Sequence, residues 1–365
     1  FQKQDWILYA SLAVLMSASL LMMASIGSNF FIQQLISVLI AVVLMFYFST
    51  LNWRALRSYP LIILGIYFVA LAALIFTSLF ASPIRNARSW LVIGPFQFQV
   101  AELMKVAIII LFSYFFAKHH IGIAKLSNIL RSFIYLAIPA FFIFLQPDMG
   151  TMSVLLAIWV GYLLVSGLKS KHIIAGMVMI VILSAISWSF VLADYQKERI
   201  IGFFQPEYDP LGINYSTIQA KIAIGSGSFF GKGFRQGTQT QLGFLPEAAS
   251  DFVYAAFIEE WGFLGGVVVL IAFLLALFRI LVIGMNSDSN FYRLLCLGTS
   301  IMFLVQFLLN VGSATGMLPV IGITFPFFSY GGSSIIANSI LIGMVQSANR
   351  YSQGASVVKL HSSVN

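Results

Sequence analysis

The sequence is poor in charged residues. Only 9% of its 365 residues are Asp, Glu, Lys or Arg and 60% are hydrophobic, whereas a soluble domain has about 25% charged residues. The 20 basic and 12 acidic side chains are too few to solvate a globular surface, and the 35 Phe and 13 Met suit a lipid-facing exterior. The composition excludes an ordinary soluble globule and predicts an all-α, polytopic integral membrane protein.

Cysteine is almost absent. The single Cys296 excludes an intrachain disulfide and a cysteine-based metal site. The glycine-rich stretch 225–233 has Ser226 and Gly233 where a Walker motif needs Gly and Ser/Thr, and no Gly-x-Ser-x-Gly elbow occurs. The net charge of +8 fits basic loops that face anionic lipid, so we expect contact with membrane lipid and no nucleic acid.

Ten apolar runs are long enough to cross a bilayer, which takes about 20 residues. They are roughly Trp6–Ser25, Phe30–Thr50, Leu61–Ala81, Val100–Ala117, Arg131–Gln146, Gly150–Gly167, Ile173–Ala193, Phe252–Leu281, Phe291–Val311 and Phe327–Ala348. The interruption Gln146-Pro-Asp-Met-Gly150 fits either two short helices or one bent helix. The first run could also be a signal peptide, but nine more apolar runs follow it.

Lysine and arginine placement favours ten spans over nine. With ten spans, twelve basic residues lie on the side of both termini, against Arg85 and Arg88 in the opposite short loops. The twelve are Lys3, Arg54, Arg57, Lys118, Lys125, Arg131, Lys169, Lys171, Arg279, Arg293, Arg350 and Lys359. With nine spans the asymmetry vanishes, so the positive-inside rule predicts ten spans with both termini cytoplasmic.

This topology predicts one transmembrane domain, residues 1–351, with a large outer loop at 194–251. A short cytoplasmic tail at 352–365 is predicted to be disordered. All four histidines fall on the cytoplasmic side, whereas ten of the twelve acidic residues lie within the membrane or outside it. We therefore expect a functional site on the outer face that uses carboxylates, and we predict no metal ligands there.

Three ionisable residues are candidates for lining an outer cavity. Asp148 follows Pro147 at the mouth of two short helices, where freed backbone groups and a carboxylate would meet water; capping the helix from Gly150 is the alternative, and both can hold. Glu102 and Lys105 share one helical face and each costs about 2.5–3.5 kcal/mol at mid-membrane if unpaired. They face either a wet cavity or simply each other.

Pro246 and Glu247 have the pattern of a helix start. If the helix begins there, Glu247, Asp251 and Glu259 share one face and place carboxylates in a row down into the bundle. The alternative is that acidic residues in a first turn stabilise the helix dipole, which suits Glu247 better than Asp251.

Basic residues of the outer loop are candidates for binding phosphate. Most such charges are solvated, so we favour Arg199 and Lys221, which apolar residues flank. Arg88 and Lys105 would add cations, and Gln219 is a further candidate for contact with substrate.

Several motifs are shared with one known family. They are Arg88-Ser-Trp-Leu, Phe98-Gln-Val-Ala-Glu-Leu-Met-Lys105, Gln146-Pro-Asp-Met-Gly-Thr151, Asp209-Pro-Leu-Gly212, Gln219-Ala-Lys-Ile-Ala-Ile-Gly-Ser-Gly227, Gly231-Lys-Gly233, Leu245-Pro-Glu247, Asp251-Phe252 and Ser329-Tyr-Gly-Gly-Ser-Ser334. Across all ten spans the chain resembles the SEDS family (shape, elongation, division, sporulation). The run Gly237-Thr-Gln-Thr-Gln241 is more similar to its elongation branch, RodA, than to its division branch, FtsW. The chain departs at Val100-Ala101, where the family usually has Pro-Ser, and at Ala249-Ser250, where it has His-Thr.

The resemblance implies a peptidoglycan glycosyltransferase of the bacterial cytoplasmic (inner) membrane. Its substrate would be lipid II, a disaccharide-peptide on polyprenyl pyrophosphate, and its partner a class B penicillin-binding protein. We expect inverting transfer with Asp251 as general base, and Arg88, Glu102, Lys105, Asp148, Arg199, Gln219, Lys221 and Glu247 at the substrate. The sequence identifies no definite cofactor, and a divalent cation (Mg or Mn) could assist the leaving group. The alternatives are a lipid II flippase or transporter and a non-catalytic scaffold.

Overall fold

The computed structural model describes residues 4–81, 89–93, 96–119, 125–168, 194–205 and 209–362, with single positions between 171 and 192. Its helices are α1 (Trp6–Ile26), α2 (Ser28–Thr50), the short 3-10 helix η1 (Trp53–Ser58), α3 (Pro60–Phe80), α4 (Val100–Lys118), α5 (Leu126–Leu145), α6 (Met149–Val165), α8 (Asp194–Phe204), α9 (Tyr215–Ser226), α10 (Thr238–Gln241), α11 (Val253–Met285), α12 (Asn290–Thr315) and α13 (Gly332–Ser362). Strands β1 (Trp90–Ile93) and β2 (Phe96–Gln99) form one antiparallel pair.

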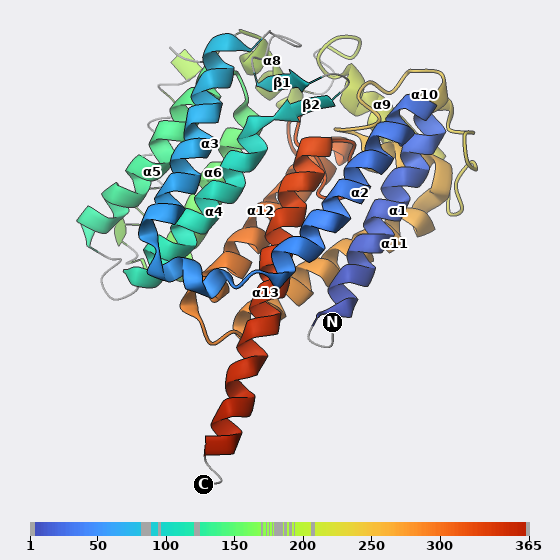
Figure 1. The fold of residues 1–365 in the computed structure, drawn as a ribbon. Coiled ribbons are helices and arrows are strands. Elements are labelled where there is room, and N and C mark those ends of the chain that lie inside the picture. Colours follow the sequence, from blue (N-terminus) through green and yellow to red (C-terminus); the bar gives the residue numbers. More distant parts are fainter. Residues whose placement is uncertain are drawn as a thin grey trace.

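The helices form an all-α bundle that the chain crosses back and forth (Figure 1). The two chain ends lie at one end of the bundle, and the hairpin β1–β2 gathers with α8, α9 and α10 at the other. Seven of the described helices, α1 to α5, α11 and α12, are long and apolar enough to cross a membrane, and α6 is apolar but shorter. The predicted class, a multi-pass α-helical membrane protein, is confirmed.

Nine of the ten predicted spans correspond to helices in the described part of the chain. The remaining one, at 173–193, lies largely outside the described residues. The break at Gln146-Pro147-Asp148 does separate two helices, with Pro147 at φ 31°. α13 extends to Ser362. The division into a transmembrane domain and a short disordered tail from residue 352 stays a prediction.

α4 is one of the most buried helices of the bundle. In the most apolar stretch of α4, 89% of the residues are buried, whereas the corresponding values for α2 and α3 are 28% and 33%. The burial of α4 follows from its neighbours, because it contacts α3, α6, α12 and α13. The hairpin leads directly into its first residue, so the start of α4 is held at the end of the bundle opposite the termini.

α11 contains a break that the apolar run did not predict. Gly262 has φ 74°, a left-handed conformation that favours glycine. The segment 228–233 crosses at this point: Lys232 N and Gly233 N donate to the carbonyls of Glu259 and Glu260, and Phe263 N donates to Ser228 O. The crossing segment thereby satisfies backbone groups that a break in a membrane helix leaves open.

Candidate active site

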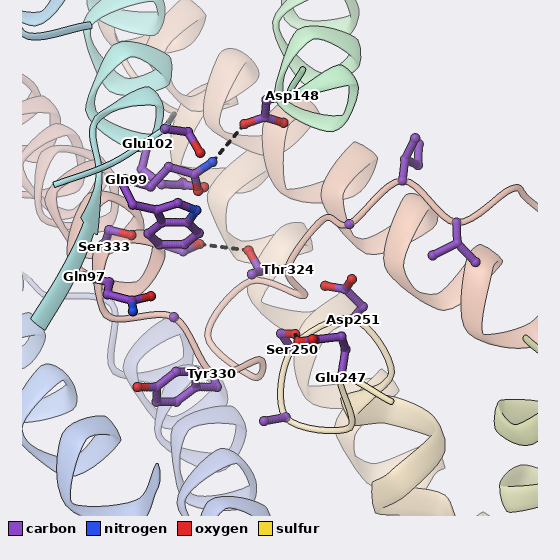
Figure 2. A pocket seen from close by; sticks show the side chains of 18 of the residues that line it. Gln97, Gln99, Glu102, Asp148, Glu247, Ser250, Asp251, Thr324, Tyr330 and Ser333 are labelled. Atoms are coloured by element: carbon purple, nitrogen blue, oxygen red, sulfur yellow. Dashed lines mark hydrogen bonds between the residues drawn. The ribbon is translucent and has the colours of Figure 1, made fainter. Parts of the chain in front are cut away.

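A cavity of about 1210 Å³ opens at the hairpin end of the bundle. Its wall is built from α2, the hairpin and the start of α4, the α5–α6 turn, α8, the turns before α11, the loop between α12 and α13 and the first turn of α13. Five of the predicted site residues line it: Glu102, Asp148, Arg199, Glu247 and Asp251. Figure 2 shows Glu102 and Asp148 on one side of the cavity, and Glu247 and Asp251 on another.

Asp251 lies on a turn and not on a helix. α11 begins only at Val253, and Glu247 has φ 50°, so the expected helix start at Pro246 is wrong. The amides of Ser250 and Phe252 both donate to Glu247 O, at 3.1 and 3.2 Å. These bonds fold residues 247–252 into a compact turn that presents Asp251 at the cavity.

The predicted row of carboxylates is therefore also wrong. Glu259 is fully buried and does not line the cavity. Its carboxylate accepts hydrogen bonds from Lys232 Nζ at 2.8 Å, from Gln239 N at 2.9 Å and from Thr240 N at 3.2 Å. Glu259 thus fastens the segment 232–241 to α11.

Asp148 both caps a helix and lines the cavity. Its Oδ1 accepts from Thr151 N at 2.9 Å, as an N-cap of α6 does. Its Oδ2 accepts from Gln99 Nε2 and Thr151 Oγ1, each at 2.8 Å. Gln146 does not line the cavity, because its buried amide donates back to Leu74 O and to α3 hydroxyls.

Glu102 and Lys105 form a buried ion pair in which only the carboxylate reaches the cavity. The Nζ–Oε1 distance is 2.8 Å, and Lys105 is 0% exposed. Among the described residues, Glu102 Oε2 has no hydrogen-bond partner. Lys105 lies behind Glu102, so an effect of Lys105 on a ligand would be exerted through that carboxylate.

The other predicted cations are dispersed. Arg199 lines the cavity and donates to Val320 O at 3.3 Å. Lys221 instead lines a smaller cavity of about 100 Å³ that shares Arg199, and its ammonium lies against Gly316 at the C-terminal end of α12, where a cation is favoured. Gln219 is on α9 and lines neither cavity. Arg88 lies outside the described residues.

The lining of the large cavity is acidic. Among its described residues are four carboxylates, Glu102, Asp148, Glu247 and Asp251, and one guanidinium, Arg199. In the part of the chain that the structure describes, no group of three or more His, Cys, Asp or Glu side chains could hold a metal ion. A divalent cation here would need oxygens of a bound ligand in addition to one or two carboxylates.

Neutral donors and acceptors complete the wall, and the sequence did not single them out. They include Gln33, Gln97, Gln99, Thr324, Tyr330 and Ser333. The Tyr330 hydroxyl donates a hydrogen bond to Gln33 Oε1. Gln99 and Tyr330 belong to shared motifs, which was the available signal. Amide and hydroxyl groups beside a carboxylate base suit a ligand rich in hydroxyls and amides.

Comparison with known proteins identifies relatives along nearly the whole chain. The family model for FtsW, RodA and SpoVE, described as cell cycle protein, matches residues 4–354. The peptidoglycan glycosyltransferase MrdB of Escherichia coli K12 is 33% identical over 286 residues, covering 78% of this chain and 77% of its own. The peptidoglycan glycosyltransferase RodA of Treponema pallidum is 29% identical and covers 94% of this chain and 97% of its own.

Solved structures of similar proteins match the fold of nearly the whole chain. A chain of a peptidoglycan synthase complex, described as coordinating polymerization and crosslinking, is 29% identical with a TM-score of 0.79, covering 95% of this chain and 98% of its own. The rod shape determining protein RodA of Thermus thermophilus is 26% identical with a TM-score of 0.71, covering 96% and 97%.

Proposed function

The chain belongs to the FtsW/RodA/SpoVE family of cell cycle proteins, and we propose that it is a peptidoglycan glycosyltransferase that polymerises lipid II. The observation that carries the proposal is the cavity of about 1210 Å³ that Asp251 lines together with Glu102, Asp148 and Arg199. Relatives of this chain bear the name peptidoglycan glycosyltransferase. The likeness to a rod shape determining protein favours a role in cell elongation.

In the proposed reaction, Asp251 is the general base. It takes the proton from a sugar hydroxyl of one lipid II, that oxygen forms the new bond to the anomeric carbon of the other, and polyprenyl pyrophosphate leaves with the bonding electrons. Attack opposite the leaving group inverts the anomeric centre. A base within the cavity wall contributes about 10²–10⁴-fold to such a step. The neutral wall groups, such as Gln97, Gln99 and Tyr330, would hold the sugar and its amides.

The leaving group carries several negative charges, and the cavity offers it little positive charge of its own. Arg199 is the cation on the described wall, and we propose Arg88 as a second. We also propose that a divalent cation accompanies the pyrophosphate; bound Mg or Mn would neutralise the charge that develops there. Chelation with EDTA should then reduce polymerisation, and Mn binding to the protein should require pyrophosphate or a substrate analogue.

We also propose a placement in the cell, on the basis of the distribution of basic residues. The concentration of Lys and Arg at the end that holds both termini supports cytoplasmic termini and an outward-facing cavity in the inner membrane. Because a related chain forms part of a peptidoglycan synthase complex, we propose a class B penicillin-binding protein as partner. Co-purification of tagged proteins from detergent extracts tests this.

The decisive experiment is polymerisation by the purified protein in liposomes supplied with lipid II, with products read as a ladder of glycan strands. The proposal requires ladders from the wild type and ladder formation at least about 10²-fold slower from Asp251→Asn. Transport of lipid II by a protein that forms no ladder would favour a flippase. Activity only of an added penicillin-binding protein would favour a scaffold.

A further inference from the structure

Asn310 lies within the apolar helix α12 and is 1% exposed. A buried polar side chain inside a membrane helix is retained against a desolvation penalty, so its contacts indicate its role. Its amide nitrogen donates to three backbone carbonyls, those of Ile323 at 2.8 Å, Asp251 at 3.0 Å and Ser250 at 3.4 Å. All three acceptors face one atom, which must therefore be the nitrogen and not the oxygen of the amide.

The three carbonyls belong to two separate segments of the cavity wall. Ser250 and Asp251 are on the turn that carries the proposed base, and Ile323 is on the loop between α12 and α13. That loop faces the base closely: a Cβ on Gly322 would lie 3.6 Å from Asp251 Oδ2. Asn310 thus joins the base turn to the loop that faces it.

The same loop continues to the other acidic side of the cavity. A Cβ on Gly150 would lie 2.6 Å from Ile323 Cδ1 and 2.8 Å from Ile321 O, so the loop packs directly on the first turn of α6. Asp148 is the N-cap of that helix. By holding Ile323, Asn310 fixes the base turn relative to Asp148 as well.

A second tie reaches the base turn from further along the loop. Ser329 Oγ donates to Ser250 O at 2.6 Å while accepting from Phe325 N at 2.8 Å, and Tyr330 N donates to Ala249 O at 2.8 Å. These bonds hold residues 249 and 250. The bond from Asn310 reaches the backbone of Asp251 itself.

We propose that Asn310 is a positioning residue for Asp251. It determines where the base lies relative to the substrate but does not itself contact the substrate. The proposal rests on the proposed function, in which Asp251 is the base. Loss of the three bonds would let the turn and the loop move apart. A displacement of about 1 Å at a reacting group can lower a rate about 10²-fold while binding groups elsewhere are unchanged.

The test compares Asn310→Leu with a matched control, Gln306→Leu. Gln306 is one helical turn earlier on the same face of α12, is 0% exposed, and its amide has no hydrogen bond to the described residues. We expect Asn310→Leu to lower kcat for lipid II polymerisation about 10- to 100-fold with KM within about twofold of wild type. Gln306→Leu should leave both constants within about twofold.

Hydrogen exchange separates positioning from a general structural role. In Asn310→Leu, amide protection should fall in 247–252 and 318–331 and remain at the wild-type level in the rest of α11 and α12. A kcat within twofold of wild type overturns the proposal. So does a fall in kcat accompanied by loss of substrate binding and of protection throughout both helices.

Two further variants close the remaining outcomes. If Asn310→Leu does not fold, Ser329→Ala takes its place, because it removes the bond from Ser329 to Ser250 O. This variant should lower kcat about three- to tenfold with KM unchanged. A wild-type kcat would then refute the positioning of the base by this loop. In an Asp251→Asn background, Asn310→Leu should have no further effect on the residual rate. Full activity of Asp251→Asn alone would instead refute the assignment of Asp251 as the base, on which this proposal rests.

Discussion

Replacing Asp251 with asparagine removes the charge and the basicity of the side chain while keeping its shape. The main-chain bonds of the turn do not depend on the carboxylate: Ser250 N and Phe252 N bond Glu247 O, and Asn310 holds the Asp251 carbonyl. Gly322 next to the Asp251 side chain leaves room for an amide as well as a carboxylate. Even a Cβ added to Gly322 would lie 3.6 Å from Asp251 Oδ2, an ordinary van der Waals distance. Asp251→Asn should therefore fold and insert as the wild type does.

The expected loss is that of a general base. Such groups contribute about 10²–10⁴-fold, which is roughly 2.7–5.4 kcal/mol of transition-state stabilisation at 1.36 kcal/mol per tenfold. The assay is the initial rate of lipid II polymerisation in liposomes, with melting temperature and partner co-purification measured on the same preparations. The rate should fall at least 10²-fold while the other two measurements stay at wild-type values.

Two carboxylates nearby serve as controls with opposite roles. Glu247 lines the same cavity, and its Oε2 accepts from Ser250 Oγ at 3.2 Å. Glu259 is away from the cavity and holds Lys232, so Glu259→Gln should lower the melting temperature more than the rate per folded molecule. An active Asp251→Asn together with an inactive Glu247→Gln would transfer the base to Glu247 and refute the assignment.

Three other substitutions test the structure around the cavity. Lys105→Met leaves the Glu102 carboxylate buried without its cation and should destabilise the protein by about 3–5 kcal/mol in thermal unfolding. Adding Glu102→Gln should recover most of that loss, and equal melting temperatures for the single and double variants would contradict this. Gly262 has φ 74°, and Gly262→Ala places a Cβ 2.3 Å from a backbone nitrogen of the crossing segment, so this variant should not yield folded protein in detergent. A monodisperse, wild-type-like preparation would show that the break in α11 is dispensable. Gln99→Leu removes the 2.8 Å bond to Asp148 and should raise KM for lipid II several-fold with the melting temperature nearly unchanged, an expectation that an unaltered KM would rule out.

The membrane class and most of the helices could be predicted from the sequence. Apolar runs of about 20 residues have few other stable environments, and this locates α1 to α5, α11 and α12 to within several residues. The break before α6 was also predictable, because Pro147 and Asp148 interrupt an apolar run. Shared motifs located Glu102, Asp148 and Asp251, all of which the structure brings to one cavity.

The tertiary structure alone determined which charged groups meet there and how. Lys105 and Glu102 are equivalent by helical spacing, yet the packing around α4 leaves only Glu102 at the cavity. Glu247 has φ 50° and Gly262 has φ 74°. Hydrogen bonds to other segments of the chain hold the backbone in these conformations, with residues 250–252 at Glu247 and residues 228–233 at Gly262. The apolar pattern of the sequence therefore does not signal that the helix is absent at Glu247 or broken at Gly262. Asn310 looks like an isolated polar residue in an apolar run. Its contacts with Asp251 and Ile323 exist only because the turn before α11 and the loop after α12 meet beside it. Hydrophobic runs are local and can be read along the chain, whereas the positions of a few carboxylates depend on contacts between residues far apart in the sequence.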